Sequence, residues 1–145
     1  MAKRILLPLD KTIDAESVVD AVADMARGGG ATVRLLHVAP VPDNVESGGR
    51  VLAYADQEAA RLENEGLDYL AAVEARVGGA PVECVVRFGE PAREILLEAD
   101  GFGADLVVMS TKRASGLGRL VLGSVAEQVL RRARPSVMLF RAARE

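Results

Sequence analysis

The residues best suited to chemistry lie in the segment 105–132, whose sequence is DLVVMSTKRASGLGRLVLGSVAEQVLRR. It predicts a buried strand, a loop of small residues and then a helix, an order that can hold an anion on backbone N–H groups and the helix dipole. From position 106 to position 126 there is no Asp or Glu. The cations of the same interval are Lys112, Arg113 and Arg119. The pattern therefore predicts a loop that holds phosphate.

The rest of the chain supplies strands and helices that position this loop. Apolar runs predict strands at residues 4–9, 32–38, 81–87, 106–109 and 136–140. Helical spacing predicts helices at residues 14–27, 52–77 and 124–132, with a short one that begins near Pro91. Segment 39–50, rich in Pro and Gly, is predicted to be irregular. Strands that alternate with helices predict a parallel sheet with helices on both faces.

In such a sheet, ligands bind outside the carboxyl ends of the strands, where the strand order reverses. If the first and fourth strands are neighbours, Asp10 and the loop that follows Met109 face each other across that crevice. The sequence thus places a carboxylate opposite a cationic loop.

Four residues have structural explanations that need no ligand. Pro8 cannot donate to a strand ladder and is expected at the carboxyl end of the first strand. Gly66, inside the long helix, should weaken that helix by about 1 kcal/mol relative to Ala. Cys84 shares a face with apolar neighbours and is expected to be a small core residue rather than a nucleophile. His37 is expected to be a hydrogen-bonded structural histidine.

Composition narrows the function classes. The 145 residues are 50% hydrophobic and 27% charged, which predicts one soluble domain over residues 1–145. A net charge of −3 and scarce aromatic residues argue against a nucleic-acid partner. One cysteine and one histidine argue against a disulfide or a zinc site. The N-terminal apolar run is too short for a signal peptide or a membrane span, so we expect a cytoplasmic protein without a membrane partner.

Several pieces of the sequence together resemble the universal stress protein family, nearly from end to end. They are RILLPLD, RLLHV, FGEPAREIL, GADLVVMS and SGLGRLVLGSVAEQVLRRARPSVMLF. The resemblance implies a Rossmann-like, three-layer α/β/α sandwich, similar to the adenine nucleotide alpha hydrolase-like fold, with a five-stranded parallel sheet of order 3-2-1-4-5. It also implies a homodimer paired through the last strand, around Val137, Met138, Leu139 and Phe140. An apolar edge strand of this kind needs a cover or a partner.

One branch of that family binds ATP and another does not. The signature of the ATP-binding branch is G-x2-G-x9-G-[ST], and its last pair corresponds to Gly123 and Ser124. The two earlier glycine positions hold Ser110 and Arg113. The resemblance implies further contacts with ATP or AMP, or with a magnesium ion on its phosphates through Asp10. The residues that it implies are Pro8, Leu9, Asp10, Val38, Met109, Thr111 and Val125.

The lost glycines leave alternatives open. Arg113 can supply charge-assisted contacts to phosphate in place of backbone N–H groups, or it can fill the crevice itself. The first predicts a nucleotide-binding stress protein, and the second predicts a dimeric interaction protein that binds no nucleotide. An enzyme related by fold, such as an adenylate-forming ligase or a sulfur transferase, has the least support. The sequence offers no activated nucleophile, no paired catalytic carboxylates and no P-loop, so we expect at most slow hydrolysis of ATP.

Simpler explanations exist for single site residues. Ser124 and Glu127 match the S-x-x-E capping box, which would explain Ser124 without a ligand. Asp10 can cap the turn that follows it. Lys112 can be an ordinary solvated loop charge. The arginines at 131, 132 and 134 fit a helix C-terminus, where the dipole favours cations.

Overall fold

The molecule, a computed structural model, is described for residues 2–43, 45–112 and 122–141. Its main sheet has five parallel strands in the order β5-β2-β1-β6-β7. Their bounds are β1 Arg4–Pro8, β2 Thr32–Ala39, β5 Val82–Phe88, β6 Leu106–Ser110 and β7 Ser136–Phe140. Numbered along the chain, these five strands lie in the order 3-2-1-4-5, which confirms the predicted topology. Pro8 is the last residue of β1, as its missing N–H predicts.

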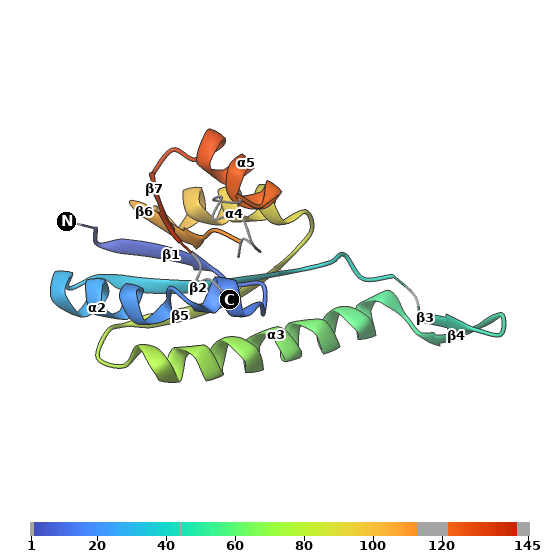
Figure 1. The fold of residues 1–145 in the computed structure, drawn as a ribbon. Coiled ribbons are helices and arrows are strands. Elements are labelled where there is room, and N and C mark those ends of the chain that lie inside the picture. The colour runs from blue at the N-terminus through green and yellow to red at the C-terminus, as the bar shows by residue number, and fades with distance from the viewer. Residues whose placement is uncertain (1, 44, 113–121, 142–145) are drawn as a thin grey trace, which may run out of the picture.

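Helices cover both faces of the sheet and make three layers (Figure 1). The helices α2 (Val19–Gly29) and α3 (Ala55–Val77) lie on one face. The helices α4 (Pro91–Phe102) and α5 (Ser124–Arg132) lie on the other. In the part of the chain that the structure describes, no helix has the length and apolar character needed to cross a membrane.

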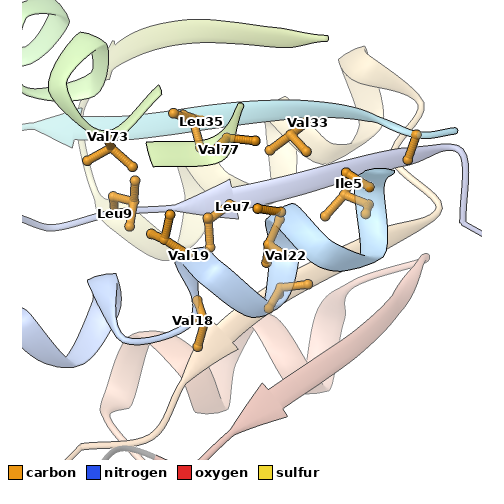
Figure 2. Packing of buried hydrophobic residues seen from close by; sticks show 14 of the residues in the cluster. Ile5, Leu7, Leu9, Val18, Val19, Val22, Val33, Leu35, Val73 and Val77 are labelled. Atoms are coloured by element: carbon orange, nitrogen blue, oxygen red, sulfur yellow. The ribbon is translucent and has the colours of Figure 1, made fainter. Parts of the chain in front are cut away.

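Consecutive residues of the central strand serve opposite layers. Ile5 and Leu7 of β1 pack with α2 and α3, whereas Leu6 packs toward α4. Figure 2 shows the first of these clusters, in which the side chains of both helices meet β1 and β2. A strand buried on both faces requires an uninterrupted apolar run, which is the signal that predicted it.

The helix predicted over residues 14–27 is two helices, α1 (Ile13–Glu16) and α2. Between them, the Ser17 hydroxyl donates to the Asp14 carbonyl oxygen at 2.6 Å. A side chain that bonds the backbone in this way competes with helix continuation. Thr12 caps α1 by accepting from the Ala15 N–H at 3.1 Å.

The prediction that segment 39–50 is irregular was wrong in its second half. Residues Val45–Ser47 (β3) and Arg50–Ala53 (β4) form an antiparallel hairpin. Gly48 and Gly49 have φ of +59° and +78°, and a two-residue hairpin turn of this type needs positive φ at both positions. Because β4 takes residues 50–53, α3 begins at Ala55 rather than at Leu52. The hairpin and the start of α3 extend beyond the sheet (Figure 1).

Gly66 lies on the face of α3 that packs against β5 and β2. A Cβ at this position would lie 2.8 Å from Cγ2 of Val86 and 3.3 Å from Cδ2 of His37. The predicted gain from Ala at this site considered the isolated helix, and the packed strand beside it reverses that expectation. Glycine is therefore what allows α3 to approach β5.

Candidate functional site

A cavity of about 460 Å³ opens at the carboxyl ends of β1, β2 and β6, beside the N-terminus of α5. It lies where β1 separates β2 from β6, so the strand order reverses there. Apolar side chains from β2, β6 and α4 form part of its wall, among them Leu36, Ile95 and Met109. Polar groups from the loops complete it. A mostly apolar pocket with a few polar groups is the usual form of a small-molecule site.

The structure brings together every predicted site residue that it describes. The residues concerned are Pro8, Leu9, Asp10, Val38, Met109, Ser110, Thr111, Gly123, Ser124 and Val125, and each lines this cavity. Arg113, the remaining predicted residue, lies outside the described residues. Segments separated by up to about a hundred positions in the sequence thus meet at one edge of the sheet.

The sequence reasoning missed part of the lining. The additional residues are Thr12, Asp14, Ala15, Leu36, Pro91, Ile95 and Ala126. Thr12, Asp14 and Ala15 lie at the start of α1, and Pro91 and Ile95 lie in α4. Only the position of α1 and α4 at this edge of the sheet adds them to the cavity. Lys112, one of the cations of the predicted phosphate loop, also lines the cavity.

Asp10 caps the turn after β1, and it does so with one oxygen. Oδ1 accepts from the Thr12 N–H at 3.0 Å and from the Thr12 hydroxyl at 2.5 Å. Within the described parts of the chain, no hydrogen bond reaches Oδ2. The turn-capping prediction is confirmed, and the second oxygen is available to a ligand in the cavity.

The first turn of α5 presents backbone amides to the cavity. Its N-cap is Gly123, which has no side chain to cap the helix, and the first helical bond runs from the Glu127 N–H to the Gly123 carbonyl at 3.0 Å. The capping-box alternative for Ser124 does not apply, because Ser124 is already the first helical residue. Glu127 instead pairs with Arg131 at 2.9 Å. The first N–H groups of a helix have no acceptor inside the helix.

The charged side chains of the described lining are Asp10, Asp14 and Lys112. The stem of Lys112 crosses the face of Gly123, since a Cβ on Gly123 would lie 2.9 Å from Cε of Lys112. Over residues 2–43, 45–112 and 122–141, no group of three or more His, Cys, Asp or Glu side chains is arranged to hold a metal ion.

The histidine beside this edge of the sheet is structural, as predicted. Nδ1 of His37 lies 2.8 Å from the Leu9 carbonyl oxygen, and its ring meets Tyr69 edge to face with centroids 5.9 Å apart. Burial raises the pKa of Tyr69, and the nearby Glu16 carboxylate raises it further. The ammonium of Lys11 lies 5.9 Å from the centre of the same ring. This cluster fixes the end of β1 against α3.

Cys84 is a packing residue, also as predicted. Its thiol donates to Oε1 of Glu74 at 3.2 Å. Burial, together with that hydrogen bond, raises the pKa of Cys84 to about 12. A nucleophilic cysteine needs the opposite shift, because the thiolate is the reactive form.

The comparison with known proteins agrees with this fold. The sequence profile of the universal stress protein family matches residues 1–141. The chain belongs to that family. A universal stress protein of Thermus aquaticus is 32% identical over 97% of this chain and 100% of its own length. The universal stress protein YxiE of Bacillus subtilis is 29% identical over 89% of this chain and 92% of its own length.

Solved structures of the family share the fold. A universal stress protein from Archaeoglobus fulgidus superposes with a TM-score of 0.68 at 26% identity, over 94% of this chain and 92% of that chain. The structure of an Archaeoglobus fulgidus universal stress protein in complex with dAMP superposes with a TM-score of 0.66 at 24% identity, over 94% of this chain and 96% of that chain. A universal stress protein in complex with cAMP superposes with a TM-score of 0.69 at 20% identity, over 98% of both chains.

Proposed function

We propose that this universal stress protein binds an adenine nucleotide, ATP or AMP, in the cavity at the carboxyl ends of β1, β2 and β6. The role would be in a cytoplasmic stress response, with at most slow hydrolysis. One observation carries the proposal: the described residues that the family resemblance assigns to the nucleotide line one cavity. Its volume, about 460 Å³, lies in the range of small-molecule sites. Two solved members of the family hold dAMP and cAMP, which supports an adenine nucleotide as the ligand class.

Each part of the cavity suits one part of a nucleotide. The apolar wall around Leu36, Val38 and Ile95 offers a dry surface for a base. Oδ2 of Asp10 suits a ribose hydroxyl or a magnesium ion carried on the phosphates. The exposed amides at the start of α5 suit a phosphate, because the helix dipole favours an anion there. The described lining contains no Cys or His side chain, which fits binding better than catalysis.

The test is calorimetric titration of nucleotide-free protein with ATP and AMP, alongside two variants. Gly123→Leu places a bulky side chain in the cavity beside Lys112 and should abolish binding. Gly28→Leu is the control, because no atom lies within 4 Å of a Cβ built there. Undiminished ATP affinity in Gly123→Leu would place the ligand elsewhere. Failure of the wild type to bind either nucleotide would favour a dimeric interaction protein without nucleotide.

The proposed assembly is a homodimer that pairs through β7. Among the described strands, β7 has a partner, β6, on one side only. Met138 is 37% exposed on this edge strand. An unpaired apolar edge favours strand addition by a second copy.

Light scattering of the wild type should give the mass of two chains. Met138→Glu should shift the protein toward monomer, since it places like charges close together across the interface. Leu97→Glu, an exposed position on α4, is the control and should stay dimeric. A monomeric wild type at micromolar concentration would contradict the dimer.

A further inference from the structure

We infer that Lys112 is the phosphate-binding side chain of this cavity and makes its affinity rise with the number of phosphates on the ligand. The inference rests on the proposed function and adds to it a residue outside the glycine positions of the motif. It also assigns a ligand preference, for nucleoside triphosphate over monophosphate. Three observations support the inference. They are the position of Lys112, the absence of a carboxylate partner for its ammonium among the described residues, and the reason why position 123 is glycine.

The first observation is the position of Lys112. It is the second residue after β6, next to Thr111, and it lines the same cavity as Asp10. Its Cδ and Cε pass 3.6 Å and 2.9 Å from the place where a Cβ of Gly123 would lie. Because Nζ is bonded to Cε, the ammonium lies beside the first turn of α5, where phosphate is expected.

The second observation is that the ammonium is unpaired. No carboxylate of the described residues lies within ion-pair distance of it, although Asp10 and Asp14 line the same cavity. A helix N-terminus carries about half a positive charge, so a cation beside it is unfavourable unless an anion lies between. The ligand-free site therefore brings two positive groups together. An anionic ligand relieves that repulsion.

The third observation explains a glycine. Gly123 has φ of −68° and ψ of 157°, an extended conformation that any residue adopts. Its backbone therefore does not require glycine. The requirement is space, because a Cβ would displace the stem of Lys112. Gly123 thus lets Lys112 lie across the helix start.

Lys11 provides an internal comparison. It lies three residues after β1, as Lys112 lies two residues after β6, but it does not line the cavity, and its ammonium lies 5.9 Å from the centre of the Tyr69 ring. Two lysines that lie shortly after neighbouring strands thus differ in their surroundings. Lys11→Met removes the same charge as Lys112→Met without touching the cavity.

The experiment measures the affinity of nucleotide-free protein for ATP, ADP, AMP and adenosine. The wild type should bind more tightly with each added phosphate. Lys112→Met should weaken ATP about 10- to 100-fold, as expected for the loss of a charge-assisted contact, and leave adenosine unchanged. Lys11→Met should keep the wild-type series.

A second measurement separates this role from a structural one. Without ligand, Lys112→Met should melt at a higher temperature than the wild type, because the repulsion at the helix start is gone. The melting temperature of Lys11→Met should not rise above that of the wild type, because this variant loses the contact of Lys11 with the Tyr69 ring. A structural role for Lys112 predicts the reverse, a lower melting temperature in Lys112→Met.

The outcomes separate the inference from the proposed function. If Lys112→Met keeps the full series from adenosine to ATP, the inference is wrong and nucleotide binding stands. If the wild type binds no nucleotide, the probe is inorganic tripolyphosphate. Should it raise the melting temperature of the wild type but not of Lys112→Met, the anion site stands and the adenine assignment falls. If tripolyphosphate raises the melting temperature of neither the wild type nor Lys112→Met, the inference and the proposed function are both wrong.

Discussion

Gly66 and Gly123 both lie where a Cβ would meet another side chain, and they differ in what fills the space. At Gly66 the neighbours are Val86 and His37, which belong to the sheet, and the closest atom would be 2.8 Å away. At Gly123 the neighbour is the end of the Lys112 side chain, at 2.9 Å. The distances are nearly equal. The first neighbour cannot move without the sheet, whereas the second is a flexible chain that reaches into an open cavity.

The difference indicates which contacts serve the fold and which serve a ligand. Around Gly66 the space is filled by rigid groups, and a change there should cost stability. Around Gly123 a flexible cation fills the space, and a change there should cost binding. The charges of the molecule differ in the same way, because Glu94 and Glu98 of α4 are paired with arginines of the sheet while Lys112 has no ion-pair partner among the described residues.

The paired charges centre on Glu98, which is 5% exposed. Its carboxylate accepts from Nη1 of Arg34 at 2.6 Å and from Nη1 of Arg87 at 3.0 Å. Burial alone lowers the pKa of each guanidinium, but the hydrogen bonds to glutamates outweigh it and raise both pKa values. The carboxylate therefore joins β2 and β5 to α4.

The largest expected effect follows from that arrangement. Glu98→Ala should lower the free energy of unfolding by about 2–3 kcal/mol, because it removes charged hydrogen bonds from a buried site. Urea unfolding measures the loss, and ATP affinity should not change. The exposed pair of Glu127 and Arg131 is the control, and Glu127→Ala should cost less than about 0.5 kcal/mol. Equal losses in the two variants would contradict the distinction.

Gly66→Ala should have the next largest effect on the free energy of unfolding. Overpacking against Val86 should cost about 1–3 kcal/mol, and the better helix propensity of Ala returns up to about 1 kcal/mol. The net change should therefore be a loss of about 1–2 kcal/mol. Gly101→Ala, in α4, meets no atom within 4 Å and should gain up to about 1 kcal/mol. The comparison fails if both substitutions stabilise the protein.

Gly123→Ala should change stability by less than about 0.5 kcal/mol, because its backbone accepts any residue and its neighbour can move. The expected change is in binding, where displacement of Lys112 should weaken ATP several-fold. Thermal unfolding and calorimetric titration of the same preparation measure both quantities. A loss of stability comparable to that of Gly66→Ala would show that the two glycines have the same role.

The smallest effect concerns pH. The pKa of Cys84 is about 12 in the folded protein against an ordinary value of 9.0, so the folded state keeps a proton that the unfolded state loses. Its contribution to stability is complete below pH 9 and decreases as the pH rises toward 12. The difference between the wild type and Cys84→Ala in urea unfolding, at pH 8 and at pH 10, measures it. A difference that does not fall with pH would show that the thiol is not buried as described.

Local patterns predicted the sheet and most of the site because its parts lie at strand ends. A buried strand must be apolar throughout, and its carboxyl end is marked by the first polar residue, as with Asp10 and Ser110. Those two signals, with the family resemblance, identified most of the lining at the ends of β1, β2 and β6, although Leu36 of β2 was missed. The order of the strands then brings these ends together.

What the sequence could not predict depends on contacts between distant segments. The cost of Ala at Gly66 depends on Val86, which lies twenty positions away and on another element. Ser124 has the pattern of a helix cap, but Gly123 takes that position in the structure. The role of Lys112 follows from the space above Gly123. The hairpin of residues 45–53 is different, since its Gly48-Gly49 turn was a local signal that went unused.

The most direct test of the account is the melting temperature of nucleotide-free protein with and without Mg-ATP. At a ligand concentration of about 100 times Kd, binding adds about 2.7 kcal/mol to the stability of the folded state. At roughly 2–4 °C per kcal/mol for a chain of this size, the account predicts a rise of several degrees. An unchanged melting temperature at millimolar Mg-ATP, with no nucleotide released when the untreated protein is denatured, would contradict it.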